Sequence, residues 1–83
     1  MRVWFEFEDT GSDAHVELPA VPRVGEGVLW ITEGEDPDEG AVVEYRKDYR
    51  VRQVDWTISQ RLNMTPQQDP PVILVRLEFL GEA

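Results

Sequence analysis

Residues 49–58 change the phase of their hydrophobic alternation partway along, and this constrains the fold more than any other stretch. Tyr49 and Val51 place apolar side chains at odd positions, whereas the later apolar residues occupy even positions: Val54, Trp56 and Ile58. Successive side chains of a strand point to opposite faces, so a straight strand would turn half of this set into water. One extra residue at positions 52–53, a β-bulge, restores a single apolar face and bends the strand. A bent central strand predicts a short sheet that curls into a small β-barrel.

Turn signals divide the rest of the chain into short apolar segments without helical periodicity. Besides residues 49–58, strands are predicted at residues 2–8, 15–18, 28–32, 41–45 and 72–80. We expect one all-β domain over residues 1–83, a small barrel of five to six short antiparallel strands. The chain should turn near positions 47–48, and Trp56 should be a core residue.

The connections between these segments differ in composition. Residues 19–27 contain Pro and Gly and should cross the sheet as an ordered loop, with Val21 and Val24 tucked beneath it. Residues 33–40 are too acidic to pack and should form a mobile loop. Residues 59–71 form a long polar connection with room for one helical turn. Residues 28–32 are apolar on both faces, which predicts cover on both faces or a barrel corner.

Two motifs resemble a pattern of small SH3-like β-barrels. Pro22-Arg-Val-Gly-Glu-Gly-Val28 is similar to their Pro-x-x-Gly-(Asp/Glu)-x-Val step, and Tyr49-Arg-Val-Arg-Gln-Val-Asp-Trp56 to a strand that follows it. The resemblance covers roughly residues 19–58 and implies the barrel architecture. Such barrels serve as adaptors, nucleic-acid binders, phage structural parts and small inhibitors, so no single activity is implied.

Size and composition indicate a soluble cytoplasmic protein. The chain has no cysteine, which excludes disulfides and thiolate metal sites. No apolar run suits a signal peptide or approaches the roughly 18 residues of a membrane span. The formal net charge is −9, and residues 1–44 hold twelve acids but only two bases. Such a segment repels nucleic acid and attracts a basic partner, although acids also serve solubility alone.

Catalytic and metal-binding patterns are not recognisable in the sequence. His15 is the only histidine, and neither Ser12 nor Ser59 has an evident base beside it. The acidic segment from Asp36 does not match a calcium loop, because Gly40 and Lys47 stand where that pattern needs acids. We therefore predict a non-enzymatic protein with no cofactor and no metal.

Four bases are interleaved with two aromatic residues in the middle of the chain: Arg46, Lys47, Arg50 and Arg52 with Tyr45 and Tyr49. Bases with aromatic residues suit single-stranded nucleic acid. The net acidity argues against that partner, and cross-strand ion pairs with Glu6, Glu8 or Glu44 are the expected use of these bases. A small molecule or nucleotide bound beside Arg46, Arg50 and Arg52 remains an alternative.

The leading hypothesis is an acidic protein-interaction module that docks a basic or nucleic-acid-binding surface of a partner protein, in one form as a small phage-type inhibitor. Acidic side chains would steer the encounter: Glu33, Glu35, Asp36, Asp38 and Glu39. Trp4 with Tyr45 or Tyr49 would anchor it, although Trp4 also fits a rim position beneath residues 59–71. A third hypothesis is a structural subunit whose edge strands pair into a homodimer or larger oligomer.

Overall fold

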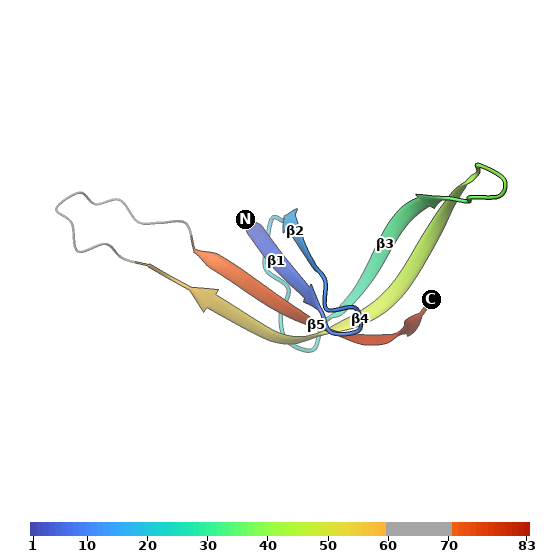
Figure 1. Cartoon of the computed structure of the whole chain (residues 1–83). Coiled ribbons are helices and arrows are strands. Elements are labelled where there is room, and N and C mark those ends of the chain that lie inside the picture. Colours follow the sequence, from blue (N-terminus) through green and yellow to red (C-terminus); the bar gives the residue numbers. More distant parts are fainter. Residues whose placement is uncertain (60–70) are drawn as a thin grey trace.

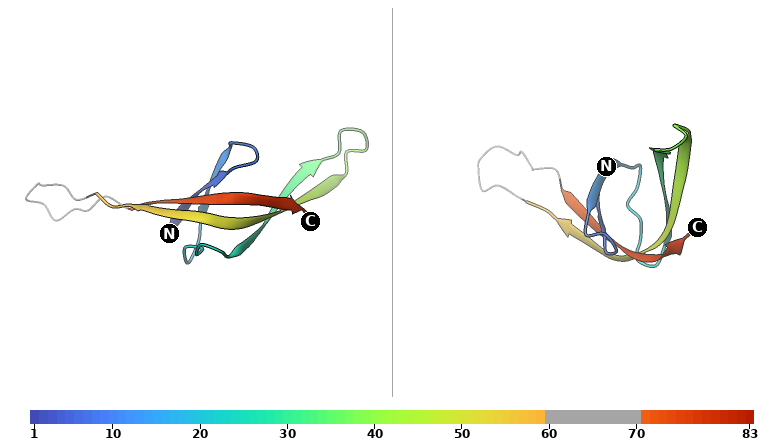
Figure 2. Two further views of the ribbon diagram at one scale, coloured as in Figure 1. Left: turned by 90° about the horizontal axis from the view of Figure 1, so that it is seen from below. Right: turned by 45° about the vertical axis from the view of Figure 1, so that its right-hand side comes forward.

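The computed structural model describes residues 1–59 and 71–83, and these form one curled sheet (Figure 1). Its five strands are β1 (Arg2–Phe7), β2 (Asp13–Glu17), β3 (Gly27–Glu35), β4 (Val42–Thr57) and β5 (Val72–Glu82). The strand order is β2-β1-β5-β4-β3, and the sheet curls into a half-barrel (Figure 2). The prediction of an all-β, small barrel-like fold is confirmed. No helix capable of crossing a membrane occurs in the described residues.

The sheet is mixed, which corrects the expectation of purely antiparallel strands. β1 runs parallel to β5, with Val3 opposite Ile73 and Phe7 opposite Leu77. A parallel pair needs a long crossover connection, and the chain between β1 and β5 supplies it. Turn signals in the sequence predict pairing only between segments that follow one another in the chain. They therefore could not predict that β1 and β5, at the two ends of the chain, pair with each other.

β4 is one continuous strand of 16 residues. The turn expected near positions 47–48 is wrong, because Lys47 and Asp48 are paired with both β3 and β5. The predicted bulge is confirmed: Val51 lies opposite Leu77 and Gln53 opposite Arg76, which leaves Arg52 as the extra residue. The bend in β4 lets one end of the strand pair with β3 and the other end with β5 (Figure 1).

The core lies on the concave face of the sheet and consists of eight buried side chains, Val3, Phe5, Phe7, Tyr49, Val51, Ile73, Val75 and Leu77. Trp30 of β3 joins this cluster from the side, since its ring meets Phe5 and Phe7 edge-on at centroid distances of 5.3 and 4.7 Å. Such aromatic pairs contribute about 0.5–1.5 kcal/mol beyond the area they bury. Trp30 therefore links β3, at one edge of the sheet, to the β1–β2 hairpin at the other edge.

Trp56 is not a core residue, contrary to the sequence-based expectation. It lies opposite Ile73 near the end of the β4–β5 ribbon and is 48% exposed. The loop of residues 19–26 only flanks this end of β4: Val21 is half-buried, whereas Val24 is exposed rather than tucked beneath the loop. Alternation in the sequence indicated the face of the strand on which Trp56 lies. Whether other segments of the chain cover that face depends on the tertiary structure.

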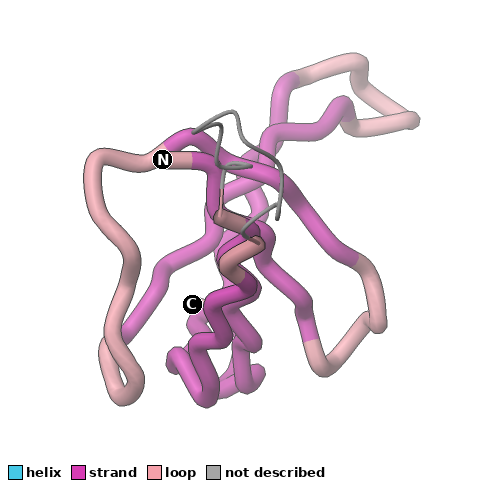
Figure 3. The backbone as a smooth tube through the Cα atoms, turned by 90° about the vertical axis from the view of Figure 1, so that its left-hand side faces the viewer, coloured by secondary structure: helices cyan, strands magenta, loops and turns pink. Residues whose placement is uncertain are grey.

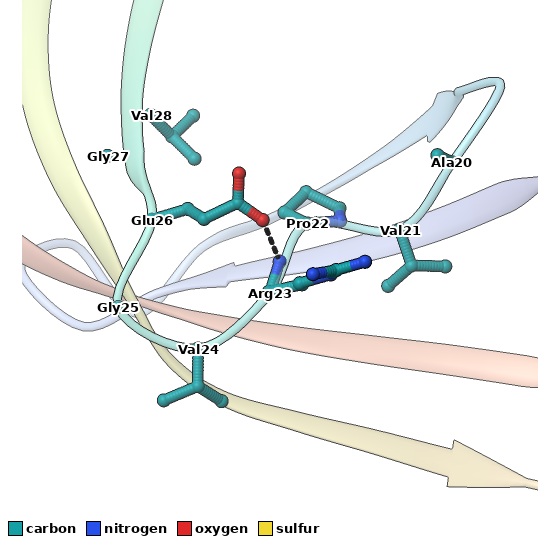
Figure 4. A pocket seen from close by; sticks show the side chains of 9 residues that line it. All are labelled: Ala20, Val21, Pro22, Arg23, Val24, Gly25, Glu26, Gly27 and Val28. Carbon is teal, nitrogen blue, oxygen red and sulfur yellow. Dashed lines mark hydrogen bonds between the residues drawn. The ribbon is translucent and has the colours of Figure 1, made fainter.

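The loop of residues 19–26 is ordered, as predicted, because it is bonded to β4. The Gly25 amide donates to the Val51 carbonyl (2.8 Å), and the Val51 amide donates to the Glu26 carbonyl (2.9 Å). Gly25 has a φ of 91°, a conformation that suits glycine. The Glu26 carboxylate closes the turn by accepting from the Arg23 amide at 2.7 Å (Figure 4).

Deleting Arg52 should unfold the protein or lower its free energy of unfolding by at least about 3 kcal/mol, because the residues after it would change faces. Arg52→Ala keeps the extra residue and removes only the exposed ion pair with Glu8, so it should lower the free energy of unfolding far less than the deletion does. Urea denaturation followed by tryptophan fluorescence measures both. Equal losses in the two variants would contradict the role assigned to the bulge.

Candidate functional site

An acidic hairpin projects from the half-barrel where β3 and β4 run beyond the core (Figure 2). We call residues 32–45 the acidic arm. Glu33 and Glu35 belong to β3 rather than to a loop, which corrects the predicted boundary. The remaining acids lie in a hydrogen-bonded turn rather than an unstructured loop: the Asp36 amide donates to Ala41, the Gly40 amide to the Asp36 carbonyl, and the Asp38 amide to the Asp36 carboxylate.

The carboxylates of the arm are only partly neutralised. Glu33 lies opposite Glu44 in the ladder, a like-charge pairing that costs stability. Arg46 relieves it from one side, with its Nε 3.2 Å from the Glu44 carboxylate. Within the described part of the chain, no ion pair involves Glu33, Glu35, Asp38 or Glu39. The arm therefore keeps a negative field at its tip.

Tyr45 is the exposed aromatic residue of the arm. Its ring lies over Gly34, where an added Cβ would come within 2.9 Å of the ring carbon Cε2. Glycine at position 34 thus makes room for the ring, although Tyr45 stays 53% exposed. Of the two tyrosines proposed as anchors from the sequence, Tyr45 is the accessible one.

Tyr49 is buried, which corrects the expectation that it is available as an anchor. It is 3% exposed and packs against Phe7 and Phe79. Its hydroxyl lies 3.2 Å from both carboxylate oxygens of Asp9, and Lys47 Nζ lies 3.3 Å from the same group. Burial, together with the hydrogen bond and the charge of Asp9, raises the pKa of Tyr49 to about 12. The residue is structural.

Trp4 lies on the opposite face of the sheet from the core. It is 38% exposed, donates its Nε1–H to the Asp13 carboxylate at 3.0 Å, and tilts against His15 at a centroid distance of 4.2 Å. The structure does not bring Trp4 together with the arm, because β1 and β3 are separated by β5 and β4. The alternative that residues 59–71 cover Trp4 falls mainly on positions outside the described residues.

Three basic residues of β4 form ion pairs in the described part of the chain: Arg46, Lys47 and Arg52. The predicted pairing across strands is found for Arg52 with Glu8, whereas Arg46 pairs with Glu44 along β4 itself, and Glu6 lies 3.9 Å from Arg76 of β5. Arg52 Nη1 binds both carboxylate oxygens of Glu8 at 2.9 and 2.7 Å. Arg46 binds Glu44, and Arg50 lies opposite Glu78 in the ladder. The bases are therefore spread along one strand beside acids and do not converge on a common anion, which leaves little support for the small-molecule alternative.

The structure also contains a feature that the sequence analysis missed. β2 and β3, the two edge strands, border a cleft of about 540 Å³ whose lining is mainly apolar. Leu29 and Ile31 of β3 lie at this cleft and are 48% and 45% exposed. The unusual apolar character of residues 28–32 on both faces was the available signal. The expectation was cover on both faces or a barrel corner, whereas the structure leaves Leu29 and Ile31 on the uncovered face of an edge strand.

A second hollow, of about 850 Å³, follows the loop of residues 20–28 (Figure 4). Its charged lining residues are Arg23 and Glu26, and the Glu26 carboxylate is already bonded to the Arg23 backbone. This hollow is shaped by the packing of the loop itself. We therefore take the acidic arm and the cleft between β2 and β3 as the candidate functional surfaces.

Comparison with known proteins finds no matching family model, no matching curated protein and no matching solved structure. The functional argument therefore depends on the geometry and charge of this chain.

In the Tyr45→Phe variant, Tyr49 is the only tyrosine, and its phenol should ionise near pH 12 while the protein is folded. The unfolded chain ionises near 10, so the stability that depends on the neutral phenol is complete below pH 10 and is lost as the pH rises toward 12. Ultraviolet absorbance titration, with circular dichroism to confirm folding, measures this. Asp9→Asn should lower the Tyr49 pKa, and a midpoint near 10 with Asp9 intact would contradict the assignment.

Proposed function

We propose that this protein is a non-enzymatic interaction module that binds a basic surface of a partner protein. The observation that supports this most is the acidic arm, a projecting hairpin whose tip carboxylates Glu35, Asp38 and Glu39 have no cationic partner in the described residues (Figure 1). A stable fold does not need these charges so close together, since like charges repel. A basic partner would relieve that repulsion.

The expected mode of binding is steering followed by anchoring. A net charge of −9 concentrated toward one hairpin accelerates the encounter with a basic surface and disfavours nucleic acid. Tyr45, exposed over Gly34, supplies an aromatic contact at the same hairpin. A specific form of the proposal is a small inhibitor of phage type that occupies the nucleic-acid-binding groove of a cytoplasmic protein.

Basic peptides selected from a random display library at low salt should bind the protein with an affinity that falls as salt rises. Replacing three acids at the tip of the arm (Glu35→Gln, Asp38→Asn and Glu39→Gln) should lower the association rate constant about fivefold or more, because steering depends on the local field. Surface plasmon resonance at several salt concentrations measures the rate.

A matched control removes the same charge from β4 and β5 through Asp55→Asn, Glu78→Gln and Glu82→Gln. This variant should slow association less than about twofold, since these acids lie on the β4–β5 ribbon and not at the tip of the arm. Equal slowing by both variants would contradict the role of the arm. A library that yields no basic peptide would contradict the proposed function as a whole.

A structural subunit is the second candidate function, and one observation favours it. β2 and β3 both expose an unpaired edge in the described part of the chain, and such edges pair readily with another strand. Repulsion between chains of charge −9 opposes self-association. Light scattering should accordingly show a monomer at low salt; a dimer that persists as the protein is diluted would favour the structural subunit.

A further inference from the structure

The two edge strands face a common cleft on the open side of the half-barrel. β2 and β3 rise on the same side of the β4–β5 ribbon (Figure 1). The cleft between them is lined by Phe5 below, by Val16 and Leu18 of β2, and by Val28 and Trp30 of β3. β2 and β3 are the two edges of the sheet, and Figure 3 shows the curled backbone from another side.

Hydrogen bonds at the ends of each ladder determine which backbone groups are free. In the β1–β2 hairpin, Leu18 donates to Met1 and Phe7 donates to Ser12, so the even-numbered residues of β2 bond to β1. Hydrogen-bonded pairs alternate along an antiparallel ladder. The odd-numbered residues of β2 therefore direct their amides and carbonyls away from β1, at Asp13, His15 and Glu17.

The same argument applies to β3. Asp36 donates to the Ala41 carbonyl, and Val51 donates to the Glu26 carbonyl, at the two ends of the β3–β4 ladder. Both pairs belong to one register, in which the even-numbered residues of β3 bond to β4. The free backbone groups of β3 are those of Gly27, Leu29, Ile31, Glu33 and Glu35. Within residues 1–59 and 71–83, both walls of the cleft thus offer a row of backbone groups that no neighbouring strand bonds.

The spacing of the walls excludes direct pairing and admits an intervening strand. No Cα atom of β2 lies within 8 Å of a Cα atom of β3. Neighbouring strands lie about 4.8 Å apart, so two strands separated by one other strand lie roughly 9.6 Å apart. The volume of about 540 Å³ is also in the range of sites that hold a bound molecule.

The side chains on the two walls define the chemistry of an occupant. Inward residues such as Val16 and Trp30 are apolar and pack against the core. The outward residues of β2 are acidic at Asp13 and Glu17. Those of β3 are apolar at Leu29 and Ile31, beside the cleft, and acidic at Glu33 and Glu35, further along the strand. A strand between them would therefore need apolar residues pointing inward that alternate with Lys or Arg pointing outward. A second copy of this chain would set acidic edges against acidic edges.

We propose that the cleft binds an extended segment of a basic partner protein, which adds a strand between β2 and β3 and closes the barrel. This inference rests on the proposed function and names the mode in which the partner is held. β2 and β3 run in opposite directions, so the added strand is antiparallel to one and parallel to the other. The nine-residue β3 offers the longer edge and the antiparallel pairing.

The capped peptide Lys-Val-Lys-Val-Lys-Val-Lys is a direct probe of this inference. Added to the full protein, it should slow amide hydrogen exchange at Leu29, Ile31 and His15, whose amides are free, and leave Trp30 and Val16 nearly unchanged. A peptide of the same composition in block order, Lys-Lys-Lys-Lys-Val-Val-Val, keeps the charge but loses the alternation. It should bind about tenfold or more weakly if strand addition holds the peptide.

Leu29→Pro and Leu29→Ala form the matched pair of variants. Proline is tolerated at an edge position whose amide faces outward, so both variants should fold, but only the proline variant loses the donor. Both variants lose the leucine side chain, so their difference reports the amide donor: Leu29→Pro should bind the alternating peptide about tenfold or more weakly than Leu29→Ala does.

Three results would overturn the inference. The first is absence of binding by the alternating peptide. The second is binding that leaves amide exchange at Leu29 and Ile31 unchanged, or that has equal affinity for both peptides. In that case the proposed function would still stand if basic peptides bind through the arm. The third is protection of these amides in the free protein that grows with its concentration, which would assign the cleft to a second copy.

Discussion

The bulge at Arg52 is the constraint on which the rest of this structure depends. β4 serves two partners, β3 toward its start and β5 toward its end, and it must keep one apolar face through both pairings. The extra residue allows Val51 and Val54 to share the concave side while the strand bends. That bend directs β3 back toward the β1–β2 hairpin. The half-barrel, its core and its cleft all follow from it.

The sheet curls without closing into a complete barrel, and the small number of contacts between β3 and the core is consistent with this open shape. Val28 and Trp30 of β3 pack against the core, and the Trp30 ring meets Phe5 and Phe7. Eight buried side chains make a small core for a chain of 83 residues, and domains of this size bury little more than about 60% of their unfolded surface. An additional strand in the cleft would cover Leu29 and Ile31 from the side and satisfy both edges. Binding and completion of the fold would then be a single event.

Charge gives the exposed edges their selectivity. Unpaired strand edges invite association with any other edge, and acids placed along them oppose pairing with a second acidic copy. Asp13 and Glu17 on β2, with Glu33 and Glu35 on β3, are in these positions. The same charges favour a basic strand. In the proposed function, the acidic arm would steer a basic partner and the cleft would hold it.

Local patterns in the sequence indicated most of the strand segments and the bulge at Arg52, because alternation acts between near neighbours. They also indicated that the central bases pair with acids, but the fold decided that Arg52 meets Glu8, 44 residues away. Only the tertiary structure decided that β1 runs parallel to β5, that Tyr49 is buried on Asp9 while Trp56 is exposed, and that β2 and β3 border one cleft. Each of these depends on which distant segments come to lie side by side. A period of two residues shows which face a side chain occupies, but not what covers that face.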